Sequence, residues 1–124
     1  MAVWRTPQGY FAQAYERARL ESSFNLWSSP DGLTWTPVDL GAEPYEIHDL
    51  AHTGILFAVG KTQTMEDGAQ AAFWSSKSGI QWDTVRPDDP SSVEPWIAGE
   101  SEGRIVVLGW NRTPDGAVTA WIFN

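Results

Sequence analysis

Short apolar runs, separated by polar stretches and glycines, recur along the whole chain. The clearest run, at positions 54–60, is apolar, rich in strand-forming residues and introduced by Gly54. Similar short runs, each following a polar or glycine-containing turn, lie at 24–27, 35–38, 71–74 and 82–85. Glycine suits the positive φ that tight turns require. This pattern predicts β-strands joined by tight turns.

These runs belong to a repeat. Trp27, Trp74 and Trp121 are each 47 positions apart, and the segment LWSSPDGLTW at 26–35 matches FWSSKSGIQW at 73–82. A second series, in which a glycine introduces an apolar strand, begins at Gly9, Gly54 and Gly103. A third series places an aromatic residue after Glu-Pro, at Tyr45 and Trp96. A four-stranded unit of about 40–50 residues is typical of a β-propeller blade.

The repeat divides the chain into three units, at about 2–40, 44–87 and 95–124, which together form a single domain. The third unit ends after its third strand, so the chain contains about 2.75 four-stranded antiparallel blades. Pro37 falls in the outermost strand of the first unit, and its missing N–H predicts an edge position. Helix-forming residues at 12–20 compete with the repeat, which predicts a strand at 10–15 and a hairpin loop at 16–21. We favour the strand.

The segment Ser28-Ser29-Pro30-Asp31-Gly32-Leu33-Thr34-Trp35 resembles the Asp-box, or BNR repeat, of sialidase-like β-propellers. The family motif reads Ser-x-Asp-x-Gly-x-Thr-Trp. Ser28, Gly32, Thr34 and Trp35 match it in place, and Asp31 stands one position late. The second copy keeps Ser75, Gly79 and Trp82 but has Lys77, Ser78 and Gln81 at the other motif positions, and the third unit has no such box. The resemblance implies a turn between the third and fourth strands of a blade, with a structural and not a catalytic role.

Propellers close with about four to eight blades, so 2.75 blades leave two end faces that carry tryptophan. Exposed apolar faces of that size drive association. The sequence therefore predicts a homodimer that closes a six-bladed ring around a two-fold axis, the blade number that the resemblance implies. A higher closed ring, or a position within a longer chain, are the alternatives.

The amino-acid composition limits the classes of binding partner and of chemistry that the chain can support. Sixteen acidic residues oppose eight basic ones, giving a net charge of −8 that disfavours nucleic acid and anionic membranes. The chain has no cysteine and two histidines, so thiolate chemistry and a histidine-rich metal centre are excluded. No motif predicts a cofactor, a metal ion or a catalytic residue.

The functional prediction is a non-catalytic binding or scaffold module that self-assembles and takes a glycan or another small ligand. Near the innermost strands, aromatic and polar side chains would line the channel, because a sugar stacks on an aromatic face while its hydroxyls form hydrogen bonds. The predicted lining residues are Arg5, Tyr45, Glu46, His48 and Trp96.

Two alternatives remain. One is a sialidase-like glycoside hydrolase fragment, although Tyr45 and Glu46 are adjacent and a strand would direct them to opposite faces. The other is a purely structural half-propeller from a longer or engineered protein. The N-terminus lacks the apolar run of a signal peptide, so we expect a soluble protein, either cytoplasmic or secreted as part of a longer precursor.

Overall fold

A computed structural model describes residues 2–15, 24–40, 45–64, 68–86, 93–110 and 118–123. Within these ranges the chain forms eleven strands and no helix. The strands are β1 (Ala2–Thr6), β2 (Gly9–Tyr15), β3 (Phe24–Ser29), β4 (Thr36–Pro37), β5 (Tyr45–His52), β6 (Leu56–Thr64), β7 (Gly68–Ser76), β8 (Asp83–Val85), β9 (Pro95–Ser101), β10 (Arg104–Trp110) and β11 (Val118–Phe123).

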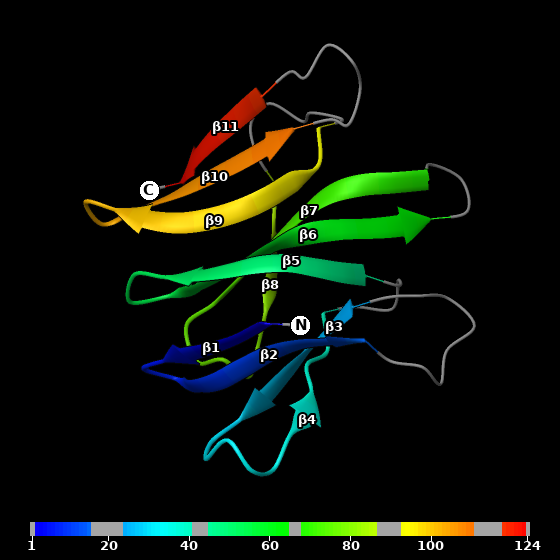
Figure 1. Ribbon diagram of the computed structural model, residues 1–124. Helices are drawn as coiled ribbons and strands as arrows, with labels where there is room; N and C mark the ends of the chain where they lie inside the picture. Colours follow the sequence, from blue (N-terminus) through cyan, green and yellow to red (C-terminus); the bar gives the residue numbers. More distant parts are fainter. Residues whose placement is uncertain are drawn as a thin grey trace.

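The strands form three antiparallel sheets in which each strand pairs with its neighbours in sequence (Figure 1). The first sheet has the order β1-β2-β3-β4, the second β5-β6-β7-β8, and the third β9-β10-β11. Figure 1 shows the second sheet between the other two. The order of strands is the one that the repeat predicted, including the three-stranded third sheet.

The second sheet is covered on both faces. Along β6, Leu56 and Ala58 face the first sheet, whereas Phe57 and Val59 face the third. Because side chains alternate across a strand, one continuous apolar run can serve two cores. This explains why the run at 54–60 is apolar at almost every position.

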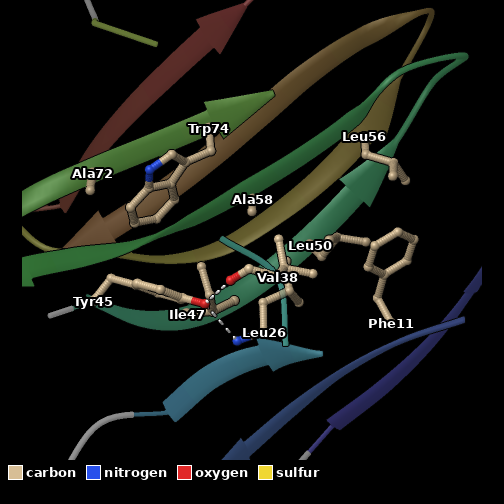
Figure 2. Close-up of a cluster of buried hydrophobic side chains, with 10 residues drawn as sticks. All are labelled: Phe11, Leu26, Val38, Tyr45, Ile47, Leu50, Leu56, Ala58, Ala72 and Trp74. Atoms are coloured by element: carbon tan, nitrogen blue, oxygen red, sulfur yellow. Dashed lines mark hydrogen bonds between the residues drawn. The ribbon is translucent and has the colours of Figure 1, made fainter. Parts of the chain in front are cut away.

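The core between the first and second sheets is shown in Figure 2. Trp74, from β7, is almost fully buried in this core, which also contains Phe11 and Leu26 of the first sheet. Tyr45 lies in the same core, where its hydroxyl donates to the Val38 carbonyl (2.8 Å) and accepts from the Leu26 N–H (3.4 Å).

The core between the second and third sheets is rich in phenylalanine. Phe73 lies at its centre, 5.4 Å from Trp121 and 5.4 Å from Phe123 between ring centroids. Phe57 packs 4.7 Å from Phe123. Trp74 and Trp121, predicted to fill layers between repeat units, each pack on the sheet that precedes their own.

The two local predictions about the first sheet are confirmed in the described residues. β2 is a strand to Tyr15, in spite of its helix-forming composition, and the predicted loop at 16–21 lies outside the described residues. Pro37 lies in β4, the edge strand of its sheet. The described residues contain no helix long and apolar enough to cross a membrane.

Candidate functional site

The turn from β3 to β4 is built by two side chains. The Ser29 hydroxyl accepts from the Gly32 N–H (2.7 Å), and Asp31 Oδ1 accepts from the N–H groups of Leu33 (2.8 Å) and Thr34 (3.0 Å). The Trp35 indole donates to the Gly32 carbonyl (3.1 Å). The turn thus satisfies its own backbone groups.

The turn from β7 to β8 repeats this arrangement. Ser76 accepts from the Gly79 N–H (2.8 Å), Ser78 accepts from the next two N–H groups, and Trp82 donates to the Gly79 carbonyl (3.3 Å). Ser78 therefore takes the place of Asp31, so the second motif is less degenerate than its sequence indicates. In the first turn it is Ser29, and not the adjacent Ser28 that matches the family motif, whose hydroxyl makes the turn hydrogen bonds.

Acid should weaken the first turn. Hydrogen bonds from the backbone N–H groups of Thr34 and Leu33 lower the pKa of Asp31 below its ordinary value. Because the pKa of Asp31 is lower in the folded chain than in the unfolded chain, its ionised carboxylate stabilises the fold at pH values above the unfolded-state pKa. This stabilisation is lost as the pH falls below about 4. We expect Asp31→Asn to lower the melting temperature by about 2–4 °C at neutral pH, and the difference from wild type to vanish in acid. Thermal unfolding followed by circular dichroism tests this.

The control is Asp83→Asn, which changes an exposed aspartate of β8. It should leave the melting temperature within about 1 °C of wild type at every pH. An Asp31→Asn deficit that persists in acid would contradict the account of this turn.

β5 and β9, the first strands of the second and third sheets, carry equivalent β-bulges. In β5, Ile47 pairs with Gly60 and Asp49 pairs with Val59, which leaves His48 as the extra residue. In β9, the register shift between the partners of Leu108 and Gly109 leaves Trp96 as the extra residue. A β-bulge redirects the side chain of the added residue. His48 is therefore the counterpart of Trp96, and the sequence alignment of Tyr45 with Trp96 was wrong.

Both bulges depend on glycine in the neighbouring strand. A Cβ on Gly60 would overlap the Glu46 carbonyl, and one on Gly109 would overlap the Glu94 carbonyl. The bulged strand lies so close to its neighbour that only glycine fits there.

The two bulged residues meet between the second and third sheets. The rings of His48 and Trp96 are stacked, with centroids 4.2 Å apart and planes 9° apart. Trp110 lies against Trp96 at 6.0 Å, and the Trp96 indole donates to the Trp110 carbonyl (3.1 Å). Asp49 adds a second link between these sheets, since its Oδ2 accepts from the Ala98 N–H (2.9 Å).

An ionic cluster surrounds the stacked rings. The Lys61 ammonium lies 3.2 Å from Glu46 Oε2 and 3.5 Å from Glu94 Oε1. His48 Nε2 lies 3.3 Å from Glu94 Oε1 and 3.9 Å from Glu46 Oε1. Partial burial acts to lower the pKa of Lys61, but the hydrogen bonds and charges of Glu46 and Glu94 outweigh it and raise that pKa. Lys61 is therefore a cation that holds the two carboxylates together.

The structure brings together three of the five predicted lining residues, namely Glu46, His48 and Trp96. Tyr45 lies in the core between the first and second sheets. Arg5 is exposed on β1, and no contact within the described part of the chain joins it to the ionic cluster.

Sequence reasoning missed Lys61 and Glu94 as members of this group. Glu46 and Glu94 are 48 positions apart, a spacing close to the repeat, which was the available signal. Across the described residues, no set of three His, Asp or Glu side chains is arranged to hold a metal ion.

The outer face of the third sheet is apolar, and no other described sheet packs on it. Four of its side chains are among the large hydrophobic residues most exposed in the described structure: Ile97 (48%), Leu108 (39%), Val118 (68%) and Ile122 (60%). These residues alternate with those that face the second sheet. On the first sheet, Val3 (60% exposed) and the partly buried Trp27 face away from the second sheet.

A scan of protein-family models, a search of curated proteins and a search of solved structures each found no match to this chain.

Proposed function

We propose that this protein is a non-catalytic scaffold module in which two chains join their three sheets into one six-bladed β-propeller. In this arrangement each sheet is a blade, and the outer face of the third sheet of one chain covers the outer face of the first sheet of the other. The observation that carries the proposal is the equivalence of cross-strand rows in the three sheets.

One row in each sheet contains the repeated tryptophan, and we call it the tryptophan row. It is Val3–Ala12–Trp27 in the first sheet, Leu50–Ala58–Trp74 in the second and Ala98–Val107–Trp121 in the third. The second and third of these rows pack on the preceding sheet. Among the described residues, the first row has no preceding sheet to pack on.

The tryptophan rows pack against a second set of rows, which we call receiving rows. They are Ala2–Gln13–Leu26 in the first sheet, Asp49–Val59–Phe73 in the second and Ile97–Leu108–Ala120 in the third. In the first of these rows, Leu26 belongs to the same buried cluster as Trp74, and in the second, Phe73 contacts Trp121. No described part of the chain packs on the third, so we assign it to the tryptophan row of a second copy.

The charge distribution supports the same pairing. The chain has sixteen acidic residues, yet none belongs to the tryptophan row of the first sheet or the receiving row of the third. Depletion of charge at the centre of a patch is typical of protein interfaces. A two-fold axis would form two such contacts at once and leave neither apolar face exposed.

Disulfide trapping tests this pairing in a chain that has no cysteine of its own. Between the second and third sheets, Asp49 of a receiving row contacts Ala98 of a tryptophan row. Ile97 and Val3 occupy the same row positions in the proposed contact between two chains. Val3→Cys mixed with Ile97→Cys should therefore give a disulfide-linked species of twice the chain mass on oxidation, since a disulfide needs Cα atoms within about 7 Å.

The matched control mixes Ile97→Cys with Ile80→Cys. Ile80 is 83% exposed but lies in the turn from β7 to β8, away from both outer faces. This mixture should form little cross-linked product at the same concentration. Equal cross-linking in both mixtures would indicate random collision and would count against the proposal.

Carbohydrate binding at the inner strands stays a prediction, and the contacts of His48, Glu46 and Glu94 limit the surfaces that a sugar could use. His48 stacks on the ring of Trp96, so that surface of the indole is not open to a sugar. Glu46 and Glu94 both contact Lys61, which argues against a free carboxylate pair for glycoside hydrolysis. Glycan-array binding without turnover of a fluorogenic glycoside would support a lectin, and turnover would support the hydrolase alternative.

A further inference from the structure

The β7–β8 turn of the second sheet rests on the β1–β2 hairpin of the first sheet. The Gln8 side-chain amide donates to the Lys77 carbonyl (3.4 Å), and the rings of Trp82 and Phe11 meet edge to face with centroids 6.0 Å apart. A Cβ on Gly79 would lie 3.0 Å from the Phe11 ring and 3.3 Å from the Gln8 Cβ. The contact between these sheets therefore extends to their turn end, where Figure 1 shows the β1–β2, β5–β6 and β9–β10 hairpins together.

The proposed contact between two chains brings together the equivalent turn and hairpin. The β3–β4 turn of one chain takes the place of the β7–β8 turn, with Asp31 at the position of Ser78. The β9–β10 hairpin of the other chain takes the place of the β1–β2 hairpin, with Arg104 at the position of Gly9. Two opposite charges thus lie on facing turns, so this inference rests on the proposed function.

The side chains of Asp31 and Arg104 are both available for such a contact. The hydrogen bonds that Asp31 accepts within its turn, from Ser29, Leu33 and Thr34, all reach Oδ1. A carboxylate has two acceptor oxygens, so Oδ2 can accept from a second group. Arg104 is exposed and forms no ion pair with another residue in the described part of the chain.

We propose that Arg104 of each chain forms an ion pair with Asp31 of the other, and that this pair fixes the orientation in which the two chains join. Within the chain, Gln8 provides the polar link at this end of the sheets, and the equivalent positions Gly9 and Ser78 carry no charge. The charged pair therefore belongs to the contact between chains. Complementary charges of this kind give an interface its specificity and its register.

The contribution of each pair is small, but symmetry doubles it. An exposed ion pair strengthens an interaction by up to about 5-fold. A two-fold axis forms the pair twice, so loss of both copies should weaken association by about 10-fold. Salt screens exposed charges, so this loss should decrease at high ionic strength.

A double-mutant cycle tests the pair, with dissociation constants measured by sedimentation over a range of concentrations. Asp31→Ser removes the charge and keeps the turn, because Ser78 supports the equivalent turn, and Arg104→Gln changes an exposed side chain. Each variant should associate about 10-fold more weakly than wild type, and the double variant should also lose about 10-fold. Two independent effects would multiply to about 100-fold and would overturn the ion pair.

Arg86→Gln is the matched control, because it removes the same charge from an exposed residue beside β8 in the second sheet. Its dissociation constant should stay within about 2-fold of wild type. A loss equal to that of Arg104→Gln would reveal a general effect of net charge and would contradict the pair.

Cross-linking of Val3→Cys with Ile97→Cys separates this inference from the proposed function. Cross-linking together with independent effects in the cycle would reject the ion pair and leave the paired arrangement in place. A wild-type chain that keeps its single-chain mass, with no cross-linking, would reject both.

Discussion

Gly60→Ala is expected to lower the free energy of unfolding by more than about 3 kcal/mol, or to prevent folding. The added Cβ would overlap the Glu46 carbonyl and lie within 3.0 Å of the Ile47 Cα atom. Both obstacles are backbone atoms of the β5 bulge, so no side-chain movement relieves the overlap. Urea unfolding followed by tryptophan fluorescence measures the loss.

Gly99→Ala provides the matched control, because its Cβ would meet nothing within 4 Å. Its unfolding free energy should stay within about 0.5 kcal/mol of wild type. If Gly60→Ala unfolds at the same urea concentration as Gly99→Ala, β5 and β6 do not approach each other as described, and the bulge that positions His48 is absent.

Trp27→Ala is expected to weaken self-association by about 100-fold, equivalent to about 3 kcal/mol, while the chain stays folded. Trp27 occupies the same row position as Trp74 and Trp121, but no sheet in the described part of the chain packs on its row. A large aromatic side chain at the centre of an interface contributes strongly to affinity. Sedimentation over a range of concentrations measures the dissociation constant.

Trp74→Ala is the comparison at the equivalent buried position. It should lower the free energy of unfolding by about 3–5 kcal/mol, because Trp74 is 2% exposed and packs between the first and second sheets. The two variants remove the same atoms from equivalent rows. If Trp27→Ala associates as tightly as wild type, the first sheet is not the contact surface.

Much of the fold could be predicted from the sequence, because each repeated tryptophan marks the same strand of its sheet. The 47-residue spacing placed Trp27, Trp74 and Trp121 correctly, and it gave strand β2 against its helical composition. Local propensity is weak compared with packing, so a strand paired on both sides can form from helix-favouring residues.

The candidate site was harder to predict because of the bulges. One extra residue changes which side chains of a strand face a given sheet, and sequence similarity does not reveal where it is inserted. The Glu-Pro-aromatic similarity aligned Tyr45 with Trp96, whereas the strand register aligns His48 with Trp96. Lys61 was not predicted, because the equivalent residue in the third sheet is Trp110. The repeat therefore shows no second charged residue at this position.

The central claim is that two chains close one ring, and the mass in solution tests it most directly. Light scattering behind a sizing column should give about 28 kDa, twice the 13.8 kDa of the chain. At a protein concentration of about 100 μM, apolar faces of this kind should associate. A stable species of single-chain mass at that concentration would contradict the paired arrangement.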